Sequence, residues 1–422
     1  MDLNIFLFNK YVGTVFHTIN DFLFRYDKSY IQDNNIPISI YLPFQEKDYD
    51  SFQCLAFFNA LLPEGSLLTD ISNATLISEY STMKLLKLLG QECAGALSFF
   101  DIHEYTIEES IELLTNSVFL NNTNYKEISK TELKEIIDAS YKKPFLISSK
   151  KTSTTLCGSE NKIPLAFFNN KWHLPSRPSP TTHIIKPSSK EIPSLSINEY
   201  ICNYLARSLK IDVPDFSIMF LDDNPIFITQ RFDRIIDKEN KKIIKIHQES
   251  FSQALGIKSY TKYQKDGGPS IASSIALLKK VSANSEKDIE RFCSIIVFNY
   301  LIGNTNAHGK NYSLLYSKYS KPVLSPFFDL VATSIYPSYS QKMSMSIGEE
   351  YNLSEIKKEH FLKEAKISKI SPSLFFNEVI YIKDNIDKEF KGIENRLDLK
   401  NYKMVISSIK EMIYQRLNNL TS

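Results

Sequence analysis

The first hundred residues alternate short apolar runs with turn residues and longer helical patterns. The pattern predicts a hairpin that turns at Asn9-Lys10 and a further strand over residues 38–42. Helices are predicted over residues 52–62 and 78–89, where an apolar face stops at Pro or Gly. We therefore expect a small α+β unit over residues 1–120, the N-terminal unit.

Residues 103–130 are polar and are expected to be a connection, followed by a short helix that starts at Thr131. Short apolar runs then predict strands, with one helix among them at residues 196–209. The predicted strands are 165–168, 172–174, 183–186, 217–221 and 225–229. A mostly antiparallel sheet with a helix packed on it is the simplest arrangement. This strand-rich region is assigned residues 121–249.

From residue 250 to residue 422 the apolar period becomes helical. Ser285 and Asp288 have the spacing of a capping box, and the segments 371–385 and 398–420 show the same period. The predicted fold class is thus α+β, with a strand-rich lobe followed by a helical lobe.

Composition narrows the class of protein. The 422 residues are 43% hydrophobic, which excludes a disordered chain, and 50 Lys+Arg against 48 Asp+Glu give a net charge of only +2. The five cysteines form no CxxC pair, which argues against a disulfide framework and a zinc site. Without a signal peptide or a long apolar run, the sequence predicts a cytoplasmic protein with no membrane partner.

The densest polar cluster is the loop Gly303-Asn304-Thr305-Asn306-Ala307-His308-Gly309-Lys310-Asn311, between a predicted buried helix and a strand. Its polar groups could simply satisfy one another. However, Asp329 follows an apolar run further along, and an Asn with a later Asp is how kinases hold Mg²⁺. Upstream, Lys186 ends a strand and Glu199 begins a helix, in the order of a phosphate-binding Lys and its orienting Glu.

From about residue 5 to residue 350, the chain resembles the HipA family of bacterial Ser/Thr toxin kinases of type II toxin-antitoxin systems. The matching segments include FFNALLPEG, THIIKPS, INEY, RFDR, HQESFSQALG, KYQKDGGPS, LIGNTNAHGKNYSLL and LSPFFDL. The resemblance implies a two-lobed protein-kinase-like fold with an added N-terminal subdomain. It also implies ATP and Mg²⁺ as cofactors.

The resemblance assigns roles to individual residues. Lys186 would contact the nucleotide phosphates, while Glu249 and Phe251 would lie at the hinge that holds adenine. Asn311 and Asp329 would bind Mg²⁺, and His308 and Lys310 would support the catalytic loop and the developing phosphate charge.

Residue 306 departs from the family pattern. The family has Asp there as the general base, whereas this sequence has Asn, which lacks the charge and the basicity. A missing general base costs roughly 10² to 10⁴ in rate, so the chain should bind nucleotide but transfer phosphate poorly. Either an engineered Asp-to-Asn change or a natural pseudokinase accounts for Asn306.

Residues 148–162 resemble the family's phosphate-covering loop, in which a hydroxyl residue is autophosphorylated. The corresponding position is Thr155, with Ser153 and Thr154 as neighbours and Gly158 beside the nucleotide. A flexible Ser/Thr-rich linker is the alternative. No GxxxxGK[ST] or GxGxxG motif occurs.

Three functions remain open at this stage. The first is a protein kinase that acts on a translation component, with aminoacyl-tRNA synthetases as the substrate class that the resemblance implies. The second is a silent nucleotide-binding module that acts with a helix-turn-helix antitoxin and so reaches DNA only indirectly. The third is a small-molecule phosphotransferase, against which the N-terminal unit argues. Because all matched phosphate and metal positions follow residue 150, that unit is expected to be dispensable for nucleotide binding.

Overall fold

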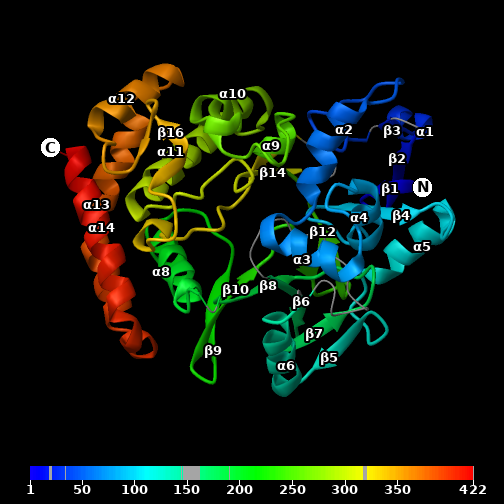
Figure 1. Cartoon of the computed structure of the whole chain (residues 1–422), viewed down its shortest axis with the longest axis horizontal. Helices are drawn as coiled ribbons and strands as arrows, with labels where there is room; N and C mark the ends of the chain where they lie inside the picture. The colour runs from blue at the N-terminus through cyan, green and yellow to red at the C-terminus, as the bar shows by residue number, and fades with distance from the viewer. Residues whose placement is uncertain are drawn as a thin grey trace.

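The computed structural model describes residues 1–18, 21–33, 35–143, 145, 162–189, 191–316 and 321–421. The N-terminal unit lies beside the strand-rich region, and long helices at the C-terminal end of the chain form the opposite side of the molecule (Figure 1). The α+β fold class and the order of a strand-rich lobe before a helical lobe are as predicted. The domain boundaries stay a prediction.

The N-terminal unit is built on an antiparallel sheet with the strand order β3-β2-β1-β4. Its strands are β1 (Asp2–Leu7), β2 (Lys10–His17), β3 (Phe22–Tyr26) and β4 (Leu97–Asp101). Its helices are α1 (Lys28–Gln32), α2 (Ser51–Phe58), the 3₁₀ helix η1 (Asn59–Leu61), α3 (Gly65–Thr75), α4 (Thr82–Leu89) and α5 (Ile107–Ser117). The predicted hairpin is present, but its turn lies one residue earlier than predicted: Phe8 and Asn9 turn with φ of 51° and 63°, and Lys10 already pairs with Leu7.

Two expectations for this unit are wrong. Residues 38–42 are not a strand but a loop. The Tyr26 hydroxyl accepts from the Ile38 amide and donates to the Leu42 carbonyl, and so holds both ends of this loop in the core. Residues 103–130 are not a plain connection, because they contain α5, which opens with a capping box between Thr106 and Glu109. They also contain β5 (Tyr125–Ile128).

The strand-rich region carries a second sheet with the order β5-β7-β6-β8-β10-β9, antiparallel throughout. Its further strands are β6 (Ile163–Phe168), β7 (Lys171–Pro175), β8 (His183–Pro187), β9 (Phe216–Leu221) and β10 (Asn224–Gln230). Helix α8 (Leu195–Ser208) packs on β9 and β10, as predicted, and α6 (Lys130–Ser140) precedes β6. A small hairpin follows, β11 (Arg234–Asp237) with β12 (Lys242–Lys245).

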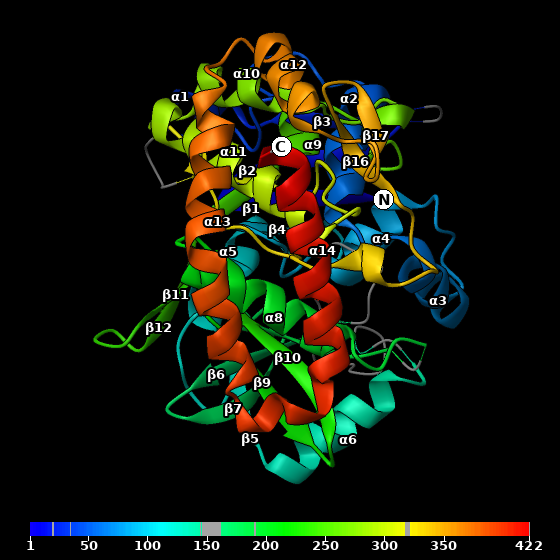
Figure 2. The ribbon, with the colours of Figure 1, turned by 90° about the vertical axis from the view of Figure 1, so that its left-hand side faces the viewer.

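The helical region packs around the buried helix α11 (Ser285–Ile302), against α10 (Ile271–Val281), α13 (Ser373–Glu394) and α14 (Lys403–Thr421). Figure 2 shows α13 and α14 side by side. The remaining elements are β13 (His247–Ser250), α9 (Phe251–Ala254), η2 (Gln264–Asp266), β14 (Ser313–Tyr316), β15 (Val323–Leu324), η3 (Thr333–Ile335), β16 (Lys342–Ile347), β17 (Glu350–Asn352), α12 (Lys358–Ile367) and η4 (Leu397–Tyr402).

The ends of α10 and α11 test the predicted caps. Ser270 caps α10, and its side chain accepts from the Ser273 amide. The expected capping box at Ser285 is wrong: the N-cap residue is Asn284, and Asp288 instead accepts from the Leu324 amide at 2.8 Å. At the other end Gly303 has φ of 65°, and a Cβ there would meet Ser334 Oγ at 2.0 Å. Glycine therefore lets the chain leave α11 directly into the polar loop.

A buried charge cluster joins the N-terminal unit to the strand-rich region. Arg231 donates to Asp233 and Glu92, each at 2.9 Å, and Arg234 donates to Glu92 at 2.5 Å. The Gly95 amide donates to Asp233 at 2.7 Å. The RFDR segment thus holds the N-terminal unit against the strand-rich region.

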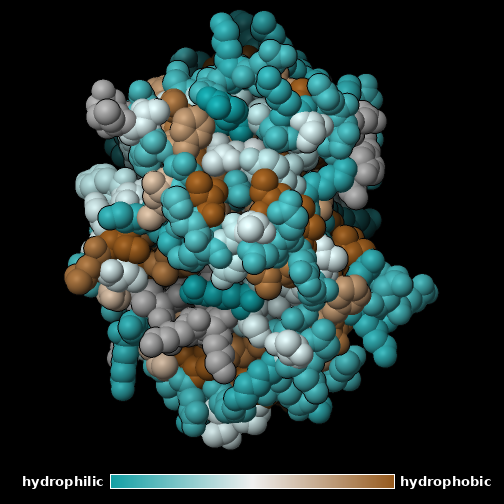
Figure 3. Space-filling model, turned by 90° about the vertical axis from the view of Figure 1, so that its right-hand side faces the viewer, coloured by the Kyte–Doolittle hydropathy of each residue, from teal (hydrophilic) through white to brown (hydrophobic). Residues whose placement is uncertain are grey.

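Much of the surface in view is hydrophilic. On the face in Figure 3, hydrophobic residues form separate spots among hydrophilic ones. Within the described part of the chain, no helix is both long enough and apolar enough to cross a membrane.

Candidate active site

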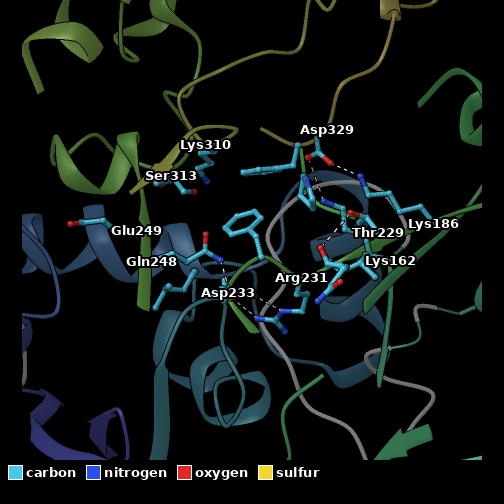
Figure 4. A pocket seen from close by; sticks show the side chains of 18 of the residues that line it. Lys162, Lys186, Thr229, Arg231, Asp233, Gln248, Glu249, Lys310, Ser313 and Asp329 are labelled. Carbon is cyan, nitrogen blue, oxygen red and sulfur yellow. Dashed lines mark hydrogen bonds and ion pairs between the residues drawn. The ribbon is translucent and has the colours of Figure 1, made fainter. Parts of the chain in front are cut away.

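Lys186 lies between two carboxylates that come from distant parts of the chain. It stands near the end of β8, its Nζ is 2.5 Å from Glu199 Oε1 on α8, and it also pairs with Asp329. Figure 4 shows the Lys186 and Asp329 side chains directed at each other. Lys186 and Glu199 are only 6% and 3% exposed, and a buried ammonium is stable because carboxylates compensate its charge.

Asp329 holds a negative charge at this point. Burial alone would raise its pKa, but the charges of Lys162 and Lys186 hold the pKa of the carboxyl well below its usual range. Lys162 Nζ lies 3.7 Å from Asp329 Oδ2. Asp329 also has φ of 54°, a left-handed conformation that Asp tolerates better than most residues.

Two adjoining cavities meet at these residues and share Lys162, Lys310, Phe328 and Asp329 in their walls. The first extends from Lys186 toward β13, between apolar side chains such as Phe227 and Phe232. The second is lined by polar residues of the loop, including Asn306 and Asn311. An apolar cavity leading into a polar, charged one suits a ligand with an aromatic base and an anionic tail.

The polar loop satisfies much of its own backbone, as the alternative interpretation predicted. Asn311 Nδ2 donates to the Asn306 carbonyl at 3.1 Å, and His308 Nδ1 accepts from the Lys310 amide at 3.3 Å. Asn304 Nδ2 donates to the Asp329 carbonyl at 3.1 Å, which ties the loop to the metal-binding candidate. This hydrogen-bonded frame presents Asn306 and Asn311 to the second cavity.

His308 is a supporting residue in this arrangement. It is 5% exposed, and burial lowers the pKa of the imidazole to about 3, so the ring is neutral. The Tyr263 ring stands edge-on to it at 5.6 Å, and the Tyr263 hydroxyl donates to Asn306 Oδ1 at 3.0 Å. Sequence reasoning missed Tyr263, because no local signal connects it to Asn306.

The predicted adenine contacts divide into two cases. Gln248, Glu249 and Ser250 of β13 line the first cavity. The Glu249 carboxylate, however, accepts from the Ile40 amide at 3.0 Å, from Ser39 and from Tyr316, and Figure 4 shows its side chain directed away from the cavity. Burial raises its pKa to about 7.

Phe251 is not in the cavity wall. It is fully buried against Phe292 and Tyr312, and its amide donates to the Tyr312 carbonyl at 2.9 Å. Of the two predicted contacts, the structure therefore offers the Glu249 backbone and places Phe251 in the core.

The N-terminal unit also lines both cavities, although it is expected to be dispensable for nucleotide binding. Ala60, Leu61 and Ala94 line the first cavity, and Glu64 lines the second. Glu64 pairs with Lys310, the predicted phosphate-supporting residue. Sequence reasoning missed these residues, because they are common types in an otherwise structural segment.

Asn311 and Asp329 fit a Mg²⁺ site completed by phosphate and water. The amide nitrogen of Asn311 is used by the Asn306 carbonyl, which leaves its oxygen as the group that could coordinate a cation. Among the described residues, no group of three or more His, Cys, Asp or Glu could hold a metal ion alone. Mg²⁺ is characteristically held by one or two protein oxygens together with nucleotide phosphates. Thr155, Ser153, Thr154 and Gly158 lie outside the described residues.

Comparison with known proteins places this site in a family. Residues 154–386 match the HipA-like C-terminal domain, and residues 3–100 match the HipA N-terminal domain. The chain belongs to the HipA family. It is similar to the putative kinase Y4mE of Sinorhizobium fredii, with 32% identity over 351 residues that cover 82% of this chain and 81% of the relative.

Other HipA relatives extend the comparison. The serine/threonine-protein kinase toxin HipA of Shewanella oneidensis is 25% identical over 349 residues, covering 80% of this chain and 76% of that protein. The solved complex of Shewanella oneidensis MR-1 HipA, HipB and operator DNA contains a chain with a TM-score of 0.81 and 22% identity, covering 99% of this chain and 97% of that one. The predicted family and the HipA-type fold are confirmed.

Proposed function

We propose that this chain is an ATP-dependent Ser/Thr protein kinase of the HipA toxin type, whose phosphate transfer is slowed by Asn306. The observation that carries the proposal is Lys186, which lines the first cavity and is buried between Glu199 and Asp329, the latter shared by both cavities. Protein kinases share this arrangement: a phosphate-binding Lys is held by an orienting Glu and lies beside an Asp that can bind Mg²⁺.

In this proposal each cavity binds one part of the nucleotide. Adenine occupies the first cavity beside the β13 backbone, and Lys186 binds the phosphates. Asn311 and Asp329 hold Mg²⁺, which neutralises phosphate charge when bound. The neutral His308 keeps the loop in place, and Asn306 stands where the base would accept the hydroxyl proton of the substrate.

A protein segment is the substrate that best fits the surroundings of Asn306. A groove shares Lys262, Asn306 and Tyr339 with the second cavity and continues along β16 and β17 to Glu355. An open groove that ends at Asn306 can admit an extended peptide whose Ser or Thr hydroxyl lies next to Asn306. We propose a translation component of the aminoacyl-tRNA synthetase class as the substrate, from the family membership.

An antitoxin partner follows from the same membership. The Shewanella oneidensis relative is found in a complex with HipB and operator DNA. We propose that this chain likewise binds a helix-turn-helix antitoxin and contacts DNA only through it.

The second candidate function is a silent nucleotide-binding module, and Asn306 is the observation that favours it. Such a module would have the same cavities and the same antitoxin partner but would transfer no phosphate. Transfer by the Asn306→Asp form separates the two candidates.

Nucleotide binding by the unmodified chain tests what both candidates share. Calorimetry is expected to show ATP binding that is stronger with Mg²⁺ than with EDTA. Asp329→Ala should weaken Mg-ATP binding by about tenfold or more, the effect of one charge-assisted contact, and should remove the Mg²⁺ dependence. Asp212→Ala, which removes an ion pair with Arg291 away from both cavities, is the matched control. Unchanged Mg-ATP affinity in Asp329→Ala would refute the metal assignment.

The phosphate-covering segment gives a prediction on regulation. In the Asn306→Asp form, residues 148–159 should become phosphorylated, foremost at Thr155, because a hydroxyl held near the γ-phosphate has a high effective concentration. The added charge of about −2 should then reduce ATP affinity by repelling the triphosphate. Phosphopeptide mapping of this form and of the unmodified chain checks the site. A phosphorylated form that binds ATP undiminished contradicts the regulatory part.

A further inference from the structure

Glu64 places a carboxylate of the N-terminal unit in the wall of the second cavity. It stands between η1 and α3, where Pro63-Glu64-Gly65 ends one helix and begins the next. One carboxylate oxygen pairs with Lys310 Nζ of the catalytic loop, and the other lies 2.9 Å from Lys262 Nζ. The Glu64 side chain is 17% exposed and the Lys310 side chain only 5%, so solvent screens this pair little.

Glu64 cannot replace the base that is missing at residue 306. Burial alone would raise its pKa, but the charges of Lys310 and Lys262 lower the pKa of the carboxyl to about 2. Each of its oxygens already accepts from a lysine. A group so weakly basic at neutral pH does not take a proton from a hydroxyl.

The three charges do not cancel. Two ammonium groups and one carboxylate leave a net charge of +1 at the wall of the cavity, which Glu64, Lys262 and Lys310 all line. Glu64 therefore fixes Lys310 without removing the positive field that a phosphoryl group would meet.

We propose that Glu64 is a positioning residue for phosphate transfer, which acts by holding Lys310 Nζ at the wall of the second cavity. A free lysine side chain loses rotamer entropy when it is fixed in place, and the ion pair with Glu64 restricts Lys310 before the substrate binds. The inference rests on the proposed kinase function. It makes the N-terminal unit a part of the catalytic machinery.

The test uses the full chain with Asn306→Asp, and follows transfer of labelled phosphate from Mg-ATP to the protein itself. If this parent form transfers nothing, the proposed function fails, and the inference that rests on it fails with it. If it is active, Glu64→Gln should lower the transfer rate by about tenfold to 10²-fold, because a misplaced catalytic group costs that much. The Mg-ATP dissociation constant should change by less than about threefold. Asp101→Asn is the matched control, since it removes a buried ion pair with Lys87 in the same unit but away from the cavities.

A double-mutant cycle separates positioning from a general structural effect. Lys310→Met should itself slow transfer, and Glu64→Gln should then add little to it, because Glu64 acts through Lys310. Independent, multiplicative losses, an unchanged rate in Glu64→Gln or an equal loss in Asp101→Asn would each overturn the inference. A faster Glu64→Gln form would also overturn it, by showing that the pair is inhibitory. If Glu64→Gln melts below the assay temperature, Glu64→Asp enters the same cycle.

Discussion

Changing Asn306 to Asp is expected to raise the rate of phosphate transfer by about 10²- to 10⁴-fold, the range that a general base contributes. The surroundings of residue 306 suit a carboxylate. Asn306 Oδ1 already accepts from the Tyr263 hydroxyl at 3.0 Å, a bond that a carboxylate oxygen would keep. The second oxygen of the carboxylate would then be available to the substrate hydroxyl.

Transfer of labelled phosphate at saturating Mg-ATP measures this gain. Asn306→Ala is the matched control, because it removes the amide without supplying a base and should remain as slow as the unmodified chain. If Asn306→Asp binds Mg-ATP and still transfers no faster than Asn306→Ala, the kinase proposal is wrong and the silent nucleotide-binding module is supported.

Asp233→Ala is expected to lower the free energy of unfolding by about 3 to 5 kcal/mol, the cost of breaking a buried ion pair from one side. Arg231, Arg234 and Glu92 are all at least 97% buried, and two guanidinium groups would be left with a single carboxylate. The Gly95 amide and Gln248 would also lose the acceptor that Asp233 provides.

Denaturant unfolding of the two forms checks this value. Asp237→Ala is the control from the adjoining hairpin, since Asp237 is half-buried and accepts from the backbone and side chain of neighbouring Asn240. It should cost less than about 1 kcal/mol. A similar loss in both variants would contradict the role assigned to the cluster.

The sequence predicted best those features that depend on the order of neighbouring residues along the chain. The apolar runs placed β6 to β10 and α8 correctly, because the apolar residues of each element follow one another locally along the chain. The order of Lys186, Glu199, Asn311 and Asp329 along the chain indicated a nucleotide site, and the structure brings all of them to the two cavities. Their roles with ATP and Mg²⁺ remain predictions.

Long-range contacts account for what the sequence did not reveal. Glu64 meets Lys310, and Glu92 meets Arg231, across separations of 246 and 139 residues, and neither pair leaves a periodic signal. The loop at residues 38–42 looked like a strand because burial, and not pairing, selects its apolar residues. Helix α5 was missed because its polar face dominates the composition of the segment.

The walls of the first cavity come from both sides of the junction that the Arg231 cluster holds. The N-terminal unit contributes Ala60, Leu61 and Ala94 to this wall, and the rest of the chain contributes Phe227 of β10 and Gln248 of β13. A molecule that fills this cavity touches both parts, so its binding favours the state in which they are joined, more strongly the higher its concentration is above its dissociation constant. Ligand binding in the first cavity and attachment of the N-terminal unit are thus thermodynamically linked. If nucleotide binds in this cavity as proposed, it would also oppose separation of the N-terminal unit from the rest of the chain.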